Sequence, residues 1–448
     1  MPRPLADLTQ ALLDAARQAG ADAADAIAVQ STSLSIDVRH GKLEEAQRAE
    51  GIDLGLRVFI GQRQAIVSSS DTRDATLATM AERAVAMARE APADPHAGLA
   101  DAAALAQDRD MSGLELHDDS PEPNPAALED TARRAEAAAM AVSGVTQVSS
   151  AGAGFGSRSV HLAASNGFSG GYRRSDHGLS VTAISGTGTG MERDYDYDGR
   201  IHAVDLRPPE EIGRRAGERA AAMQNPRRPA TGTWPVLFDE RVSASLIGHL
   251  LSAINGSGVA RGQSWLLGAL GREVLPQALS LTEDPHRPRS ASTRLWDAEG
   301  LPTRRRDIVA DGVLTTWTLD LATGRKLGLP STANAARSAG GTPSPAVTNI
   351  ALTQGAASRA DLLAQMGRGL LVTQMIGATI NPNTGDYSRG ASGFWVEDGQ
   401  IAYPVSEFTI AGSLPEMLRR IIPANDAQAH LSRVVPSLLV DAMVVAGA

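Results

Sequence analysis

The chain offers few side chains of the kinds that bind a transition metal. It contains nine histidines and no cysteine, and no two histidines have the short spacing of a metal site. His249 lies on a predicted helix, Asp239 to Ala253, without a carboxylate beside it or a second histidine within two turns. A tight zinc site needs three or four well-placed ligands. We therefore expect no metal in this chain and interpret His249 as a buried or interface histidine bonded to a backbone carbonyl, with a ligand role as the alternative.

A second group of candidate residues lies near the C-terminus, between a predicted strand from Leu370 to Met375 and a hairpin turn at Asp398-Gly399. Two interpretations are open. The segment is either a tightly turned meander or an exposed sheet edge to which an extended peptide adds as a strand. In the second case the long side chains of Tyr387 and Arg389 would project toward the substrate. His249 would belong to the same site. The candidate substrate-binding residues are Gly385, Asp386, Tyr387, Ser388, Arg389 and Gly390.

Three charged motifs have ordinary structural interpretations. The run Asp194-Tyr195-Asp196-Tyr197-Asp198 alternates carboxylates, but it lacks the fixed ligand offsets and central glycine of a calcium loop. We expect an exposed strand with its acidic side chains on one face, able to sort partners by charge. The basic clusters His286–Arg289 and Arg304–Arg306 have no aromatic or glycine companions, so we interpret them as solvated turn and strand residues rather than a phosphate site.

Several other functions have no sequence signature. The chain has no Gly-x-Ser-x-Gly nucleophile elbow and no Gly-x-x-x-x-Gly-Lys-Ser/Thr phosphate loop. Its net charge of −9 argues against general nucleic-acid binding, and the lack of cysteine excludes disulfides. No run reaches the roughly 18 apolar residues that a membrane helix needs, and the first residues have no signal-peptide pattern. We expect a soluble, cytoplasmic protein that binds neither nucleic acid nor membrane.

The order of predicted elements repeats in the first half of the chain. A helix from Leu5 to Ala19, about four short strands and a helix after Asp71 form one unit, and the same order returns after a Pro- and Asp-rich linker, from Asn124 onward. The segment Ala81–Met87 of the first unit matches Gly217–Met223 of the second. This similarity indicates an internal duplication, with chance similarity of Ala-rich helices as the alternative. It predicts two antiparallel sheets side by side, with helices on one face of each.

From about residue 230 the pattern changes to mostly short strands. The predicted fold class is α+β: a duplicated helix–antiparallel sheet–helix N-terminal lobe and a mostly β C-terminal domain, barrel-like or sandwich-like. The predicted domains are 1–115, 116–229 and 230–448. The apolar stretches Phe408–Gly412, Leu438–Val440 and Met443–Val445 predict dimerisation through the last domain, with ordinary core strands as the alternative.

The run from Gly385 to Gly412, GDYSRGASGFWVEDGQIAYPVSEFTIAG, resembles the C-terminal signature of the TldD/PmbA family, the modulator of DNA gyrase family. The resemblance extends over nearly the whole chain and is closest to the PmbA (TldE) branch. In the TldD branch, the helix corresponding to residues 239–253 carries a His-Glu-x-x-x-His zinc motif, and a cysteine completes the site. This chain lacks the motif and has no cysteine.

The resemblance implies a pseudo-enzyme: the non-zinc-binding subunit of a two-component cytoplasmic metallopeptidase that degrades or processes unfolded peptides. The implied partner is a TldD-like zinc metallopeptidase subunit in a heterodimer, so zinc is expected in the partner and no cofactor in this chain. The two subunits would enclose a cavity that extended peptides enter. The alternatives are an active metallopeptidase assembled around His249 and a non-proteolytic regulatory binding protein. Pairing of the chain with itself, when the partner is absent, is left open.

Overall fold

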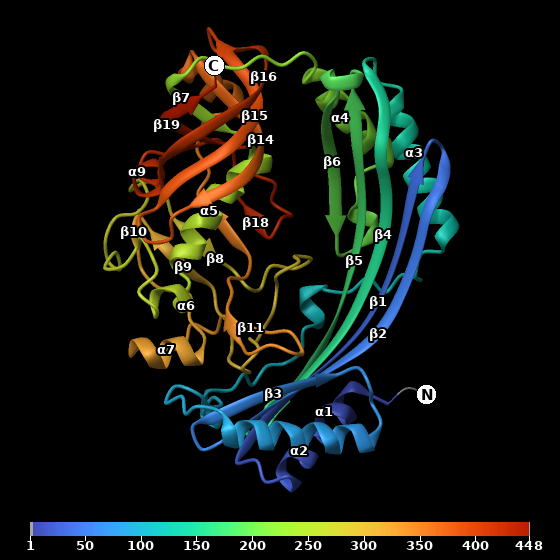
Figure 1. Ribbon diagram of the computed structural model, residues 1–448, viewed down its shortest axis with the longest axis vertical. Coiled ribbons are helices and arrows are strands. Elements are labelled where there is room, and N and C mark those ends of the chain that lie inside the picture. The colour runs from blue at the N-terminus through green and yellow to red at the C-terminus, as the bar shows by residue number, and fades with distance from the viewer. Residues whose placement is uncertain (1–2, 448) are drawn as a thin grey trace.

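The computed structural model describes residues 3–447. It shows an N-terminal lobe built on a long curved sheet and a C-terminal domain that packs against the concave side of that sheet (Figure 1). Mixed helix and strand content confirms the predicted α+β class. None of the helices in these residues is both long and apolar enough to cross a membrane.

One six-stranded antiparallel sheet forms the lobe, in the order β3-β2-β1-β4-β5-β6. The two repeated units supply three strands each and meet where β1 pairs with β4, from Asp25↔Ala164 to Val38↔Ala151. The prediction of two separate sheets was therefore wrong, because this pairing uses backbone groups that two sheets would leave open at their edges. The strands are β1 (Ala23–Arg39), β2 (Lys42–Ile60), β3 (Arg63–Ser69), β4 (Val145–Ala164), β5 (Ser169–Ser185) and β6 (Glu192–Arg200).

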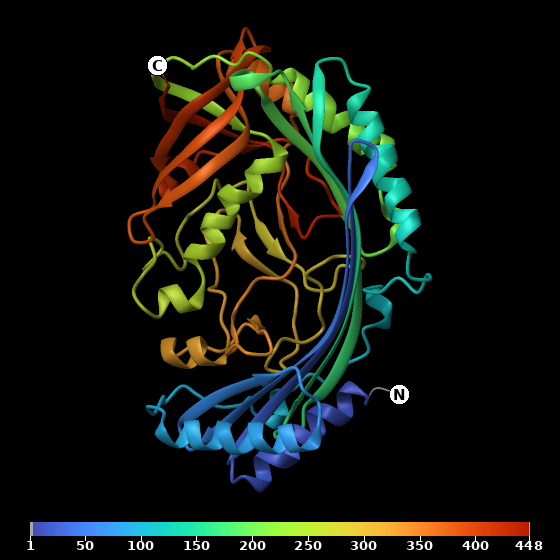
Figure 2. The ribbon, with the colours of Figure 1, turned by 45° about the vertical axis from the view of Figure 1, so that its right-hand side comes forward.

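Two pairs of helices cover the convex face of the sheet near its opposite ends (Figure 2). In β1, Ala24 and Ala28 pack under the first pair, and Leu34 and Val38 pack under the second. All four positions have the same parity, so both pairs lie on one face of the strand. The pairs are α1 (Leu5–Gln18) with α2 (Asp74–Glu90), and α3 (Pro125–Met140) with α4 (Pro209–Ala222).

The opposite face of β1 is buried as well, which explains an error in the predicted strand number. Ile27 points away from the helices and packs in a cluster with Leu105 and Trp296. The large apolar residues therefore change from odd positions, Ile27 and Val29, to even positions, Leu34, Ile36 and Val38, along one long strand. In the sequence this change looks like two short strands. The prediction of about four strands per unit was wrong for this reason. The connecting chain, 91–124, contains the 3-10 turns η1 (Ala102–Ala104) and η2 (Ser112–Leu114); η3 (Gly188–Gly190) and η4 (Ala203–Asp205) flank β6.

The C-terminal domain contains a small closed barrel. Its strands follow the order β16-β15-β14-β7-β19, and β19 pairs back with β16, which closes the ring. The barrel-like alternative is therefore confirmed. Helix α5 packs on it through Leu246 and Leu250, in one core cluster with Trp395 and Phe408. The elements are β7 (Gly232–Phe238), α5 (Glu240–Ala253), β14 (Gly369–Ile380), β15 (Asp386–Glu397), β16 (Gln400–Ser413), β19 (Leu438–Ala446) and the short β17 (Ile422–Pro423), which pairs with β19.

The C-terminal domain also contains a second sheet, in the order β10-β9-β8-β13-β18, and the two-stranded pair β11-β12. Their strands are β8 (Leu281–Glu283), β9 (Arg306–Ala310), β10 (Val313–Leu314), β11 (Ala335–Ala336), β12 (Ser344–Pro345), β13 (Ile350–Leu352) and β18 (Arg433–Val434). Short helices complete the domain: α6 (Gly256–Val259), α7 (Leu321–Leu327), α8 (Arg359–Met366) and α9 (Leu414–Leu418).

The apolar stretches from which dimerisation was predicted lie in the core. Phe408, Ile410 and Leu438 are at most 3% exposed, and they belong to the barrel cluster. Val444 alone among the apolar residues of these stretches is largely exposed, at 56%. The alternative interpretation as core strands is therefore correct, and these residues provide no surface argument for a dimer.

Candidate functional site

The lobe and the C-terminal domain meet along β6, the outermost strand of the lobe sheet. Helix α5 begins at this seam because Asp239 caps it, accepting a hydrogen bond from the backbone N–H of Arg241 at 3.2 Å. Arg241 then reaches across to β6, with 2.9 Å between its Nη1 and Oδ1 of Asp194. Both side chains are almost fully buried. This buried ion pair fixes the first turn of α5 against the lobe.

The aspartates of β6 do not form the exposed acidic face that was predicted. Asp194, Asp196 and Asp198 are only 2%, 5% and 3% exposed, whereas Tyr195 and Tyr197 between them are exposed. The prediction was wrong because α4, α5 and the chain before α4 bring arginines against the aspartate face. A paired arginine compensates the cost of burying each carboxylate.

The arginines that reach these aspartates come mostly from the lobe. Asp196 accepts hydrogen bonds from Arg219 of α4 at 2.7 Å and from Arg207 at 2.9 Å. Asp198 accepts one from Arg200 at 2.9 Å and a backbone N–H of Arg207 at 2.9 Å. These hydrogen bonds join residues of the lobe to one another, so they fix the positions of the Arg207 and Arg219 guanidinium groups.

The same side chains occupy the free edge of β6. The carbonyl oxygens of Tyr195 and Tyr197 accept hydrogen bonds from Arg219 at 3.0 Å and Arg207 at 2.7 Å. The backbone N–H of Tyr195 donates to the Asp194 carboxylate at 2.7 Å. Edge strands are commonly protected in this manner against the addition of another strand. An extended peptide cannot pair with β6 here without breaking these bonds.

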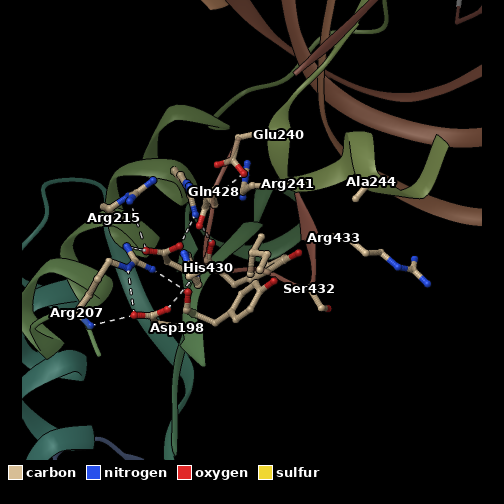
Figure 3. A pocket seen from close by; sticks show the side chains of 15 residues that line it. Asp198, Arg207, Arg215, Glu240, Arg241, Ala244, Gln428, His430, Ser432 and Arg433 are labelled. Atoms are coloured by element: carbon tan, nitrogen blue, oxygen red, sulfur yellow. Dashed lines mark hydrogen bonds and ion pairs between the residues drawn. The ribbon is translucent and has the colours of Figure 1, made fainter. Parts of the chain in front are cut away.

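Two adjoining hollows lie along the seam, and Tyr195 and Arg241 belong to the walls of both. The larger, of about 750 Å³, we call the seam cleft; the smaller, of about 230 Å³, we call the arginine pocket. The seam cleft is lined by Thr182, Ile184, Met191–Tyr195, Arg241, Val242, Ser245, Gln374–Ile376, Arg389 and Ser392. The arginine pocket is lined by Tyr195–Asp198, Arg207, Arg215, Arg219, Glu240, Arg241, Ala244, Gln428 and His430–Arg433 (Figure 3).

Two other titratable groups of the arginine pocket are shifted toward their neutral forms. Burial, followed by the charge of Arg200, lowers the pKa of His430, although Asp198 lies 3.6 Å from its Nε2. Burial, followed by the charge of Asp239, raises the pKa of Glu240, which accepts a hydrogen bond from Gln428 at 2.9 Å. Both shifts favour the uncharged form of the group.

His249 does not make the carbonyl hydrogen bond that was predicted. Its Nε2 is buried and has no hydrogen-bond partner among residues 3–447, and its ring packs edge-on against Tyr387, with 5.7 Å between the ring centroids. Burial, followed by the charge of Arg389, lowers the pKa of His249. Tyr387 is only 2% exposed, and its hydroxyl contacts the sulfur of Met375 at 3.5 Å. Burial raises its pKa to about 12. The prediction that Tyr387 projects toward a substrate was wrong, because the ring fills the space between the barrel and α5.

The segment from Gly385 to Gly390 is not a sheet edge. Gly385 precedes β15, and Asp386 to Gly390 form the start of this strand, which is paired on both sides, with β14 and β16. The meander interpretation is therefore correct, since barrel closure leaves this strand without a free side. Gly385 occupies a turn at φ +78°, Asp386 is exposed and accepts a hydrogen bond from Thr384 at 2.6 Å, and Ser388 and Gly390 are half-buried.

Arg389 is the one residue of this segment that lines the seam cleft. Its Nε donates to the carbonyl of Gly377 at 2.6 Å. The two residues lie at an irregularity of the β14–β15 pairing, between Ile376 and Thr379. This hydrogen bond fixes the base of the guanidinium. Within residues 3–447, no carboxylate forms an ion pair with Arg389, so its terminal nitrogens remain available to a ligand in the cleft.

The surroundings of His249 do not fit zinc. Its neighbours are a tyrosine ring and an arginine, whereas zinc requires several thiolate, imidazole or carboxylate ligands. No group of three or more His, Asp or Glu side chains in the described part of the chain could hold a metal ion. The nearby positive charge of Arg389 would also repel a divalent cation. No catalytic step through a metal can be derived from these residues.

The basic clusters have structural roles, as predicted, although not as fully solvated side chains. Arg289 forms ion pairs with Glu115 and Asp205. Arg306 forms an ion pair with Glu283 at 2.7 Å. These contacts join Arg289 to the connecting chain and to η4, and Arg306 to β8.

Sequence reasoning missed the arginine pocket. The signal was present in two places: the alternating aspartates of β6, and arginines at helical spacing in α4, Arg215 and Arg219. Residues four apart share one helix face, and they can face acids that recur every second residue on a strand. Only the distance between the two elements in space was unknown.

The fold and the seam define a two-part α+β protein whose domains match those of a metallopeptidase. Three family models match in succession: PmbA/TldA metallopeptidase domain 1 at residues 24–88, the central domain at 118–224 and the C-terminal domain at 231–447. The chain belongs to the PmbA/TldD family of metallopeptidases, as its sequence resemblance indicated.

Individual relatives and solved structures agree with this assignment. The chain is 36% identical to metalloprotease PmbA of Escherichia coli O157:H7, over 95% of this chain and 92% of the relative. It is 35% identical to a PmbA homologue of Haemophilus influenzae, over 97% and 94%. A crystal structure from Bacteroides thetaiotaomicron, described as a modulator of DNA gyrase, matches 99% of this chain and 98% of its own with a TM-score of 0.91 and 26% identity. TldE of Thermococcus kodakarensis shares the fold, with a TM-score of 0.87 and 20% identity over 98% and 100%.

Proposed function

We propose that this chain is the subunit of a two-component cytoplasmic metallopeptidase that does not hold the zinc, and that a TldD-like partner in a heterodimer supplies it. The observation that carries the proposal is the environment of His249 on α5. An aromatic ring and a guanidinium surround the imidazole, where a hydrolytic zinc site needs three ligands and an activated water. The family membership supplies the metallopeptidase class, and the residues of this chain do not supply the metal.

The proposal assigns the seam cleft to the unfolded peptide substrate. Its volume of about 750 Å³ falls within the roughly 300–1,000 Å³ of typical ligand sites. Ile184 and Met375 provide apolar wall, and Arg389 provides charge. A guanidinium with free terminal nitrogens can bind a peptide carbonyl or carboxylate. The cleft thus contributes to a cavity that encloses an extended peptide while the partner performs the hydrolysis.

Co-expression with a TldD-like partner tests the proposal. If it is correct, the two chains copurify, and an unfolded peptide is degraded only when both are present. Degradation stops when a chelator removes the zinc or a histidine of the partner's zinc motif is replaced, but it persists in His249→Ala of this chain. Degradation by this chain alone, with one zinc per chain that is lost in His249→Ala, would refute the proposal. A gene for a motif-bearing relative beside the gene for this chain would support it.

A further inference from the structure

The arginine pocket holds several arginines close together. Arg207, Arg219 and Arg241 pair with the carboxylates of Asp194 and Asp196, whereas Arg215, whose side chain is 36% exposed, stays 3.7 Å from its nearest carboxylates. Burial, followed by the charge of Arg241, lowers the pKa of Arg219. Like charges held close together disfavour one another. An anionic group that enters the pocket beside Arg215 would offset this repulsion.

Arg215 has hydrogen-bond donors that no described residue accepts. Arg215 of α4 approaches Asp196 and Glu211 only at 3.7 Å, without a hydrogen bond to either. Arg207 and Arg219 already bind Asp196 directly. A guanidinium carries five N–H donors and prefers planar, two-oxygen acceptors such as carboxylates. Figure 3 shows Arg215 and Arg207 on one side of the pocket, while Arg433 extends away on the other side.

We propose that the arginine pocket binds the carboxylate of a peptide, with Arg215 as its principal contact. The inference rests on the proposed function, since a peptide is the ligand of the adjoining seam cleft. Tyr195 and Arg241 belong to both walls, so a peptide in the cleft can place its C-terminus, or an acidic side chain, in the pocket. The sealed edge of β6 prevents strand pairing at this point, so recognition there depends on side-chain contacts such as this one.

Binding to the isolated chain tests the inference. Three short, N-terminally labelled peptides are compared by fluorescence anisotropy at low salt: a neutral peptide with a free C-terminal carboxylate, its C-terminal amide, and an amidated peptide with an internal glutamate. The free acid should bind roughly tenfold more tightly than the neutral amide, the difference expected for one charge-assisted contact. Added salt should reduce this difference. If the glutamate peptide also binds tightly, the pocket accepts any peptide carboxylate; if it does not, the pocket selects the C-terminus.

Two variants locate the effect. Arg215→Gln should lower the affinity of the free acid to that of the neutral amide. The matched control is Arg214→Gln, because Arg214 is the neighbouring residue but pairs with Glu218 at 2.6 Å, outside the pocket. This control should keep the preference. Ala244→Asp adds a carboxylate to the pocket wall. It should lower the affinity for the free-acid peptide even though Arg215 is intact.

The inference is overturned if the acid and amide bind equally, if no peptide binds, or if the preference survives in Arg215→Gln. Circular dichroism of each variant confirms that the fold is retained. Because the assay uses this chain alone, its failure is distinct from failure of the proposed function, which depends on copurification and degradation with the partner. Degradation by the pair without a carboxylate preference would reject only the role of the pocket.

Discussion

The Asp25→Asn variant should strongly destabilise the protein, because Asp25 joins the two parts of the chain in a buried ion network. Arg57 of β2 donates to Asp25 Oδ2 at 2.8 Å from its Nε, and Arg337 of the C-terminal domain binds the other oxygen. The three side chains are at most 5% exposed. The variant leaves two buried guanidinium groups without a counter-charge while preserving the shape of the side chain.

The expected loss in the free energy of unfolding is about 3–5 kcal/mol, the cost of breaking a buried ion pair by removing one partner. We expect the upper part of this range, because Nε and Nη2 of Arg337 already have no hydrogen-bond partner in the described part of the chain. Urea unfolding, followed by both fluorescence and circular dichroism, measures the loss. Asp74→Asn is the control, since Asp74 pairs with Arg3 at the surface, where its side chain is 86% exposed. It should change stability little.

The same network determines how stability responds to acid. Burial alone would raise the pKa of Asp25, but the charges and hydrogen bonds of Arg57 and Arg337 outweigh burial and lower it. A carboxyl whose pKa is lower in the folded state stabilises the fold above its unfolded pKa of about 3.9. That contribution disappears as the pH falls through the folded value. Asp25→Asn should therefore lose less stability on acidification than the wild type. A loss below about 1 kcal/mol at neutral pH, or an unchanged acid dependence, would refute the reasoning.

The remaining predictions concern a close backbone approach, the seam cleft and the metal. Gly55→Ala should lower the free energy of unfolding by about 1–3 kcal/mol, because a Cβ there would lie 1.9 Å from the carbonyl oxygen of Ala339. Gly51→Ala on the same strand is the control: a Cβ there would meet no atom within 4 Å, so the melting temperature should stay unchanged. Arg389→Ala should reduce peptide degradation by the assembled pair without an equal loss of thermal stability; parallel losses would assign it a purely structural role. Elemental analysis of the dialysed chain should find no stoichiometric zinc, and one zinc per chain that is lost in His249→Ala would contradict this.

The sequence predicted the fold class because the local signals were consistent over long segments. The amphipathic helices and the repeated order of elements indicated the duplicated lobe, and turn residues such as Asp398-Gly399 marked the hairpin between β15 and β16. The single sheet was missed because pairing between β1 and β4 joins residues more than a hundred positions apart. Local propensity contains no information on such a contact. The sequence left a barrel and a sandwich open for the C-terminal domain, because the pairing of β19 with β16 that closes the barrel is also a long-range contact.

The candidate site was predicted less well because burial depends on the opposing surface. Tyr387 and Arg389 lie two residues apart on one strand and share its parity, but one is in the core and the other lines a cleft. The alternation of Asp194, Asp196 and Asp198 correctly indicated a strand with acids on one face. Their exposure was predicted wrongly, because nothing in β6 itself shows that Arg241 approaches from another domain.

The duplication also explains why the seam lies on one side of the lobe. β3 and β6 occupy equivalent positions, each as the last strand of its unit and each at an edge of the shared sheet. β3, with the sequence RQAIVSS, carries no aspartate, and its end lies near the loop at Gly340, where a Cβ would be 3.1 Å from Ser68. Only β6 carries the three aspartates that pair with Arg241 of α5, Arg219 of α4 and Arg207 before α4. The difference between the two edge strands thus accounts for the unequal halves of the lobe, and residues of β6 and α5 together line both the seam cleft and the arginine pocket.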